Sequence, residues 1–179
     1  MTKFKDKYRV ESARLRGWDY TSAGWYFVTI CTYNRRCMFG RVVNGDVELS
    51  PLGKFAYQYW AEIPAHNPGV EIDAFTIMPN HTHGIIVIPE RPVETLHVTS
   101  LPSDPMSAIS PKAGSLSVIV RSYKSAVTRW AGLNGYGSFA WQERFHDHIV
   151  RDEPDLNRIR RYIHNNPLQW TLDDFYAES

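Results

Sequence analysis

VEIDAFTIMPNHTHGIIVI, residues 70–88, is the stretch that says most about the architecture of this 179-residue chain. Both of its halves, residues 70–78 and 83–88, are rich in β-branched and aromatic side chains, which favour β-strands. The Pro79-Asn80 pair between them is typical of a tight turn. The stretch is therefore predicted to form a β-hairpin.

Further strand and helix signals precede this hairpin. Residues 26–33, Tyr-Phe-Val-Thr-Ile-Cys-Thr-Tyr, predict one strand, and residues 42–49 predict a short strand pair around the turn signal Asn44-Gly45. A helix is predicted from Pro51, because proline is tolerated in a first helical turn. Apolar residues then recur at three- and four-residue steps: Leu52, Phe55, Tyr59 and Ile63.

The chain beyond residue 114 begins with a strong helical pattern and continues with an extended segment. The helix is predicted from Ser115, and three glycines after its apolar stripe are predicted to end it: Gly132, Gly135 and Gly137. Residues 140–150 predict a strand or another extended segment. The stripe itself consists of Leu116, Ile119, Val120, Tyr123, Val127 and Trp130.

A last helix is predicted after Asp152, which is suited to cap it, with Pro154 in the first turn. It stops before Pro167, because the residue that precedes a proline is pushed out of the helical region. The resulting order of elements, β–(ββ)–α–β–β–α–β–α, predicts an α+β fold with an antiparallel sheet and helices packed on it. The residues of the last helix expected to face the core are Leu156, Ile159 and Ile163.

Composition predicts one ordinary globular domain over residues 1–179, because 43% of the residues are hydrophobic and 22% are charged. Within it, residues 1–23 are predicted to form a basic N-terminal arm, and the Pro- and Ser-rich residues 89–114 a long flexible loop. The net charge of +1 excludes a globally basic protein. Any contact with nucleic acid must therefore depend on local basic clusters.

Cysteine usage and hydropathy predict where the protein works. Cys31 and Cys37 form neither a C-x-x-C pair nor a disulfide framework, which indicates a reducing compartment. No apolar run approaches the roughly 20 residues of a membrane span, and the N-terminus lacks the apolar core of a signal peptide. We expect a cytoplasmic protein without a membrane partner.

Two histidines in the predicted hairpin, His81 and His83, are candidate metal ligands. Residues i and i+2 of a strand point to the same face, so their imidazoles would lie roughly 6–7 Å apart along one face of the sheet. Such a pair suits one divalent ion, although two packed or solvated histidines would give the same pattern. Gly84, next in the chain, leaves room for something bulky nearby.

Tyr162 and Asn166 lie four residues apart on the last predicted helix, hence on one face of it. The pair can aim a phenol and a carboxamide oxygen together at whatever lies opposite. The alternative is a tyrosine on an amphipathic helix that ends in a capping asparagine. Tyr123 belongs to the apolar stripe of the preceding helix, and we interpret it as a core residue.

Three strings, in this order, resemble the REP-associated tyrosine transposases, which belong to the HUH superfamily of single-tyrosine transposases. They are Met-Pro-Asn-His-Thr-His at residues 78–83, Trp-Gln-Glu-Arg-Phe-His-Asp-His-Ile-Val-Arg-Asp-Glu at residues 141–153, and Arg-Tyr-Ile-His-Asn-Asn-Pro at residues 161–167. The similarity extends from about Gly24 to Trp170. It implies a ferredoxin-like α+β core of the HUH endonuclease type, with both histidines on a central strand.

The resemblance also implies a role for each matching residue. His81 and His83 fall on the metal-binding pair of the family, Tyr162 on its nucleophile, and Asn166 on its third metal ligand. One departure is Thr82, because the family usually has a large apolar residue between the histidines. Thr suits a strand, so we expect a small effect on packing rather than loss of the site.

The chemistry implied is metal-dependent cleavage and transfer of single-stranded DNA. Two imidazoles and a carboxamide leave open positions for phosphate oxygens on Mg²⁺ or Mn²⁺. A free phenol has a pKa of about 10, so Tyr162 needs help in losing its proton. Attack would give a covalent 5′-phosphotyrosine and a free 3′-hydroxyl, and rejoining would need no ATP. The sequence contains no Walker-type phosphate-binding motif, which agrees.

The implied partner is single-stranded DNA, folded into the hairpin ends of palindromic repeats. The stretch from Arg9 to Trp18 mixes arginine with an aromatic residue and either reads unpaired bases or is a plain tail. His146 and His148 form a second H-x-H pair, which we expect to support the first site or to contact DNA rather than to hold the metal. The candidate phosphate contacts are Arg14, Arg16, Arg121, Lys124, Arg129, Arg158 and Arg161.

Two other functions remain open at this point. One is an HUH nuclease of the replication-initiator type, although such enzymes usually carry further domains. The other is a non-catalytic protein that binds repeat-DNA hairpins. We also expect a monomer rather than a homodimer.

Overall fold

The computed structural model describes residues 20–90 and 114–177. Its centre is a four-stranded antiparallel sheet in the order β4-β5-β1-β6. The strands are β1 (Gly24–Cys31), β4 (Glu71–Ile77), β5 (His81–Ile88) and β6 (His146–Val150). The predicted hairpin of residues 70–88 is therefore confirmed as β4 and β5, and β5 is one of the two central strands.

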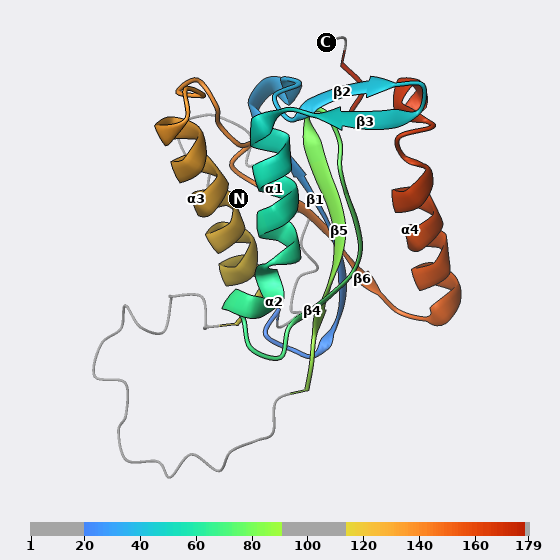
Figure 1. Cartoon of the computed structure of the whole chain (residues 1–179). Helices are drawn as coiled ribbons and strands as arrows, with labels where there is room; N and C mark the ends of the chain where they lie inside the picture. Colours follow the sequence, from blue (N-terminus) through green and yellow to red (C-terminus); the bar gives the residue numbers. More distant parts are fainter. Residues whose placement is uncertain (1–19, 91–113, 178–179) are drawn as a thin grey trace, which may run out of the picture.

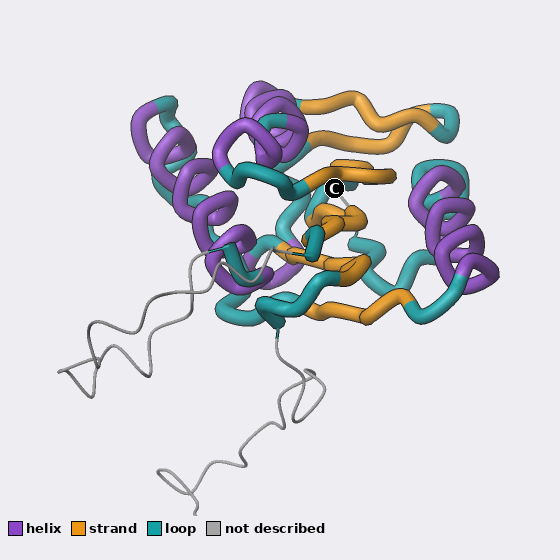
Figure 2. Tube along the Cα trace, turned by 90° about the horizontal axis from the view of Figure 1, so that it is seen from below, coloured by secondary structure: helices purple, strands orange, loops and turns teal. Residues whose placement is uncertain are grey.

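Helices cover both faces of this sheet. The helices α1 (Pro51–Ala61), α2 (Ile63–His66) and α3 (Leu116–Leu133) lie on one side, and α4 (Glu153–Asn165) lies on the other (Figures 1 and 2). The order β1-α1-β4-β5-α3-β6, with this strand arrangement, is the ferredoxin-like pattern. The α+β fold class predicted from the sequence is confirmed.

The main core lies between the sheet and the pair α1 and α3. Trp60 of α1 is fully buried there and lies directly against Gly84 of β5. A β-carbon at position 84 would come within 2.3 Å of the Trp60 ring, so only glycine fits without a shift. Gly84 thus does leave room for a bulky neighbour, and that neighbour is a core tryptophan.

A smaller apolar cluster joins α4 to the opposite face of the sheet. It is formed by Ile85 of β5 with Ile159 and Ile163 of α4, all three of them buried. The two isoleucines of α4 were expected to face the core, and they do so. Strand alternation on β5 therefore sends His81, His83 and Ile85 toward α4, whereas Thr82 and Gly84 face α1 and α3.

A two-stranded hairpin, β2 (Gly40–Val43) and β3 (Asp46–Leu49), lies outside the main sheet. Its turn is the predicted Asn44-Gly45 pair, and both residues have positive φ, at 53° and 85°. The tip reaches the chain that follows α4, because a β-carbon on Gly45 would meet the Leu168 side chain at 2.6 Å. In Figure 1 this hairpin spans the end of the sheet between α1 and α4.

Several boundaries differ from the expectations. The helix α3 continues through Gly132 to Leu133, because an exposed glycine near a helix end costs too little to stop the helix. Of residues 140–150 only the last five form a strand, and Trp141 makes an isolated bridge with Thr32. The short 3-10 helices η1 (Tyr33–Arg35) and η2 (Trp170–Leu172) were not predicted.

Most of the N-terminal arm and of the loop predicted at residues 89–114 lies outside the described residues, and so do Arg14 and Arg16. Among the residues that the structure describes, none of the helices is both long enough and apolar enough to span a membrane.

Candidate active site

The helix α4 packs so that Tyr162 faces the paired histidines of β5. The Tyr162 Oη lies 3.1 Å from Nε2 of His83, and the two rings are 5.1 Å apart between centroids. Asn166, at the C-terminal end of α4, is buried. The structure thus brings together the two pairs that the sequence singled out in separate motifs, the histidines at i and i+2 and the tyrosine and asparagine at i and i+4.

Asn80 determines which nitrogen of His81 faces the site. Its Nδ2 donates to the carbonyls of Arg35 (3.0 Å) and Phe175 (2.8 Å), so its Oδ1 points toward the ring of His81. Nδ1 of His81 lies 2.8 Å from that oxygen and must therefore carry the proton. The lone pair of His81 is left on Nε2, which is buried and has no hydrogen-bond partner.

His83 is also held by a hydrogen bond at Nδ1, although a hydroxyl can donate or accept there. Its Nδ1 lies 2.8 Å from Oγ1 of Thr29 on the neighbouring strand β1, and Phe27 stacks on its ring at 5.4 Å. Nε2 is then left to face Tyr162. The rings of His81 and His83 are 4.3 Å apart, so both Nε2 atoms approach one region. Histidines that ligate metals are commonly held by a hydrogen bond at the other ring nitrogen.

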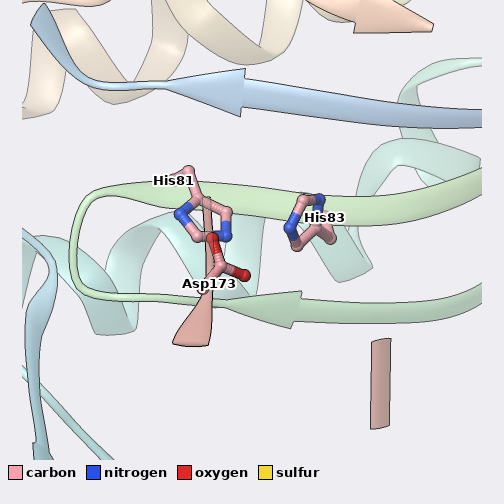
Figure 3. A group of neighbouring side chains, drawn as sticks. All are labelled: His81, His83 and Asp173. Carbon is pink, nitrogen blue, oxygen red and sulfur yellow. The ribbon is translucent and has the colours of Figure 1, made fainter. Parts of the chain in front are cut away.

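The carboxylate of Asp173 also lies beside His81 and His83, although the sequence motifs did not indicate it. Its Oδ2 accepts a hydrogen bond from Nδ2 of Asn166 at 2.5 Å and lies 3.4 Å from Oη of Tyr162. Figure 3 shows it beside His81 and His83, and the ligand atoms of these three residues lie within 4.8 Å of one another. Asp173 follows η2 in irregular chain, where no periodicity marks a functional residue.

The electrostatics of the site favour neutral imidazoles and a protonated phenol. Burial and, to a smaller extent, the Arg35 guanidinium lower the pKa of His81 to about 3, and the Asn166 carboxamide acts in the opposite direction. Burial and the neighbouring His81 also hold the pKa of His83 well below its usual value. Burial raises the pKa of Tyr162, and the Asp173 charge raises it further.

The donor set fits a divalent cation. Oδ1 of Asn166 is buried without a hydrogen-bond partner, as is Nε2 of His81. Both atoms are acceptors, and neither finds a donor among the described residues, which is costly for buried polar groups. A cation would satisfy both lone pairs. Imidazole nitrogen together with amide oxygen suits several divalent ions, so the geometry does not select one metal.

The second H-x-H pair does not enter this site. His146 and His148 lie on the edge strand β6, opposite Thr29 and Phe27, and so on the same face of the sheet as His83. Both are exposed, and Nε2 of His148 is 2.6 Å from Oδ2 of Asp155. Among the described residues, neither belongs to a group of three close metal-ligating side chains.

The candidate DNA contacts fall on two opposite layers. Arg158 and Arg161 are exposed on α4, the layer of Tyr162, and Arg158 pairs with Asp155. Arg121 and Lys124 are on α3, across the sheet. The Lys124 ammonium donates to the carbonyls of Gln142 (2.6 Å) and Glu143 (3.2 Å) and so ties α3 to that segment. Roles for these side chains in DNA binding stay predictions.

Tyr123, interpreted above as a core residue, is fully buried on the far side of the sheet from the histidines. Its hydroxyl donates to the carbonyl of Ala56 at 3.2 Å and lies 3.4 Å from Oγ1 of Thr82. The threonine between the two histidines therefore packs in the main core, away from the site. The core assignment of Tyr123 is confirmed.

Comparison with known proteins finds two relatives in Haemophilus influenzae. An uncharacterized protein of Haemophilus influenzae is 41% identical over 174 residues, which are 93% of each chain. A second protein of H. influenzae, provisionally named a REP-associated tyrosine transposase, is 24% identical over 152 residues, 84% of this chain and 74% of its own.

Among solved structures, a REP-associated tyrosine transposase bound to a REP hairpin superimposes with a TM-score of 0.56 and 22% identity, over 94% of this chain and 74% of the other. No family model matches the chain.

Proposed function

From the similarity to REP-associated tyrosine transposases, we propose that the chain belongs to that family and that it cleaves and rejoins single-stranded DNA with Tyr162 as the nucleophile. The observation that carries this proposal is the 3.1 Å approach of the Tyr162 hydroxyl to Nε2 of His83. A phenol is a weak nucleophile unless a base or a metal activates it. Here Tyr162 of α4 is partly exposed and lies against the imidazoles of His81 and His83, whose Nε2 atoms suit a metal.

The proposed metal ligands are Nε2 of His81, Nε2 of His83 and Oδ1 of Asn166, and the proposed metal is Mg²⁺ or Mn²⁺. When bound, such an ion would polarise the scissile phosphate and neutralise the negative charge that develops on it. Nε2 of His83 would exchange its hydrogen bond with Tyr162 for the ion. The phenol would remain next to the phosphate that the ion holds.

The proposed reaction is a transesterification. The Tyr162 oxygen attacks the phosphorus and forms a phosphotyrosine bond to the 5′ side of the break, while the bond to the 3′ oxygen breaks and that oxygen leaves as a hydroxyl. The phenol gives up its proton and the leaving 3′ oxygen takes up one, so the transfer consumes and releases no net proton. The reverse attack by the 3′-hydroxyl of another strand releases Tyr162 and rejoins the DNA without an external energy source.

The proposed substrate is a DNA hairpin with single-stranded flanks. It is supported by the related transposase whose structure contains a REP hairpin, over a fold that covers 94% of this chain. The exposed Arg158 and Arg161 on the tyrosine layer would contribute phosphate contacts, and so would Arg14 and Arg16.

The test is a covalent adduct assay with the full chain. A labelled hairpin oligonucleotide with single-stranded flanks is incubated with Mg²⁺ or Mn²⁺, and protein–DNA adducts are separated under denaturing conditions. The wild type is expected to form an adduct that chelation of the metal prevents, and Tyr162→Phe is expected to form none. Tyr123→Phe is the matched control, because it removes a hydroxyl on the far side of the sheet, and it should keep the adduct.

Two results would overturn the proposal. An adduct that survives Tyr162→Phe would assign the chemistry to another residue. Hairpin binding that is equally tight with and without metal, and never gives an adduct, would indicate a non-catalytic hairpin-binding protein.

A further inference from the structure

The chain that follows α4 returns to the histidines and places a carboxylate beside them. Asp173 is eleven residues beyond Tyr162 and belongs to neither of the two motifs that define the site. It lies next to all four residues discussed above, at hydrogen-bond distance from Tyr162 and Asn166 and in the same cluster of ligand atoms as His81 and His83.

The spacing of this cluster suits a single ion. Two ligands on opposite sides of a Mg²⁺ ion lie about 4.2 Å apart. The ligand atoms of His81, His83 and Asp173 lie within 4.8 Å of one another, so small side-chain rotations would bring all three onto one centre. The unpartnered, buried Nε2 of His81 and Oδ1 of Asn166 mark that centre as a place that lacks a positive group.

Several contacts hold the Asp173 carboxylate in place. Its Oδ1 accepts the backbone N–H of Phe175 at 2.6 Å, and the carbonyl of Phe175 accepts from Nδ2 of Asn80. Arg35 donates to the carbonyl of Asp174 at 2.6 Å and lies over the ring of Phe175. The Phe175 ring packs against His81 at 4.9 Å. One oxygen of the carboxylate is thus held by the backbone of Phe175 and the other by the side chain of Asn166.

Asn80 connects this segment directly to the histidines. Its oxygen accepts from Nδ1 of His81, and its amide group holds the carbonyl of Phe175, two residues beyond Asp173. One buried side chain therefore sets the orientation of an imidazole and the position of a carboxylate. Such a shared support is expected where two groups must approach the same ion.

We propose that Asp173 is a fourth protein ligand of the divalent cation, delivered by the chain after η2 and positioned through Asn80 and Arg35. The inference rests on the proposed function, since it concerns the same metal. The donors His81, His83 and Asn166 are all neutral, and Asp173 adds the one anionic oxygen. Mg²⁺ and Mn²⁺ prefer carboxylate oxygens as ligands, whereas imidazoles bind several other divalent metals as well.

Direct Mn²⁺ binding to the full chain tests this inference without relying on activity. Bound Mn²⁺ is measured from the loss of the free-ion signal in electron paramagnetic resonance. Asp173→Asn keeps the shape of the side chain and removes its charge, and it is expected to weaken Mn²⁺ binding by about tenfold or more. Asp174→Asn removes the same charge from the exposed neighbour and should change the affinity by less than about twofold.

A second pair of variants separates ligation from positioning. In Asp173→Cys the ligand would be a soft thiolate, which favours Cd²⁺ over Mn²⁺. The ratio of Cd²⁺ to Mn²⁺ affinity should therefore rise by about tenfold or more, relative to the wild type and to Asp174→Cys. A carboxylate that merely orients Asn166 would give no such change, because both ions would then be weakened alike.

The outcomes also distinguish this inference from the proposed function. If the wild type binds Mn²⁺ and forms the adduct, but Asp173→Asn binds as tightly or Asp173→Cys weakens both ions equally, only the ligand role of Asp173 is overturned. If the wild type binds no Mn²⁺ at all, the metal site itself fails, and with it the metal-dependent chemistry. If the wild type binds Mn²⁺, Tyr162→Phe should bind it as well, because Tyr162 is not a proposed metal ligand.

Discussion

Single residues in this protein act by what they exclude as much as by what they contact. Asn80 excludes one tautomer of His81, because its own amide group is committed to two backbone carbonyls. Thr29 has the corresponding place at His83. Neither residue would touch the phosphate. Asn80 decides where the lone pair of His81 points, and Thr29 holds the ring of His83 in its orientation. A histidine pair in a sequence therefore predicts a metal site only if such supports exist in the fold.

Gly84 excludes a side chain between the sheet and α1. A β-carbon there would lie 2.3 Å from the Trp60 ring and 3.0 Å from the β-carbon of Phe75. We predict that Gly84→Ala lowers the free energy of unfolding by about 1–3 kcal/mol, because overpacking forces the tryptophan to move. Urea unfolding monitored by tryptophan fluorescence measures the loss.

Gly132→Ala is the matched control for that variant. A β-carbon at Gly132 meets nothing within 4 Å, and the residue lies near the end of α3. Alanine is the better helix former, so stability should stay unchanged or rise by up to about 1 kcal/mol. Equal destabilisation by both substitutions would contradict the packing argument.

At the scale of elements, the position of α4 determines whether Tyr162 reaches the histidines. The helix is held by the buried cluster of Ile85, Ile159 and Ile163, and by a two-pronged ion pair between Arg160 and Asp73 of β4, with contacts of 2.8 and 2.6 Å. The ion pair lies at the surface, so its contribution to stability is modest. The ion pair fixes the orientation of α4 on the sheet, which the non-directional apolar contact does not determine.

The ion pair gives a pH-dependent prediction. The Arg160 guanidinium lowers the pKa of Asp73 in the folded state, so the pair stabilises the protein fully above the pKa of an unfolded aspartate, about 3.9. That stability is lost as the pH falls through the lowered pKa. Asp73→Asn should therefore be less stable than the wild type at pH 7, and the difference should shrink below about pH 4.

The measurement is urea unfolding of wild type and variant at pH 7 and at several values below 4. Asp46→Asn, on the exposed hairpin β2–β3, removes the same charge and should show no such difference at pH 7. A gap for Asp73→Asn that stays constant down to the lowest pH would show that the charge of Asp73 is not its source.

At the scale of the whole molecule, the site joins segments that are far apart in the chain. The histidines come from β5, the tyrosine and asparagine from α4, the carboxylate from the chain after η2, and the supporting Thr29 from β1. These groups come together only in the folded state. A metal that binds them should therefore stabilise the fold as a whole.

We predict that Mn²⁺ at about one hundred times its dissociation constant raises the free energy of unfolding by about 2.7 kcal/mol. The gain should disappear on chelation and in His83→Gln, whatever the stability of that variant without metal. Urea unfolding with and without Mn²⁺, at one protein concentration, measures it. An equal gain in His83→Gln would place the bound ion elsewhere.

The sequence determined the elements of this protein and the local pairing of its functional residues. Strand composition, helical periodicity and turn residues are local signals, and they predicted the order of elements, the hairpin of residues 70–88 and the N-cap of α4 at Asp152. The helix ends before Pro167, but the predicted reason for that end is wrong, because Asn166, which precedes Pro167, keeps helical φ and ψ. Strand alternation put His81 and His83 on one face, and the helical repeat did the same for Tyr162 and Asn166. The resemblance to a known family added the roles of these four residues.

Only the tertiary structure decided which pairs meet. No local signal distinguishes His81 and His83 from His146 and His148, because that depends on strand order and on where α4 docks. The same holds for Asp173, which reaches the histidines only because the chain turns back after η2. Contacts between distant segments follow from the packing of the whole chain, so the local preferences of each segment do not predict them.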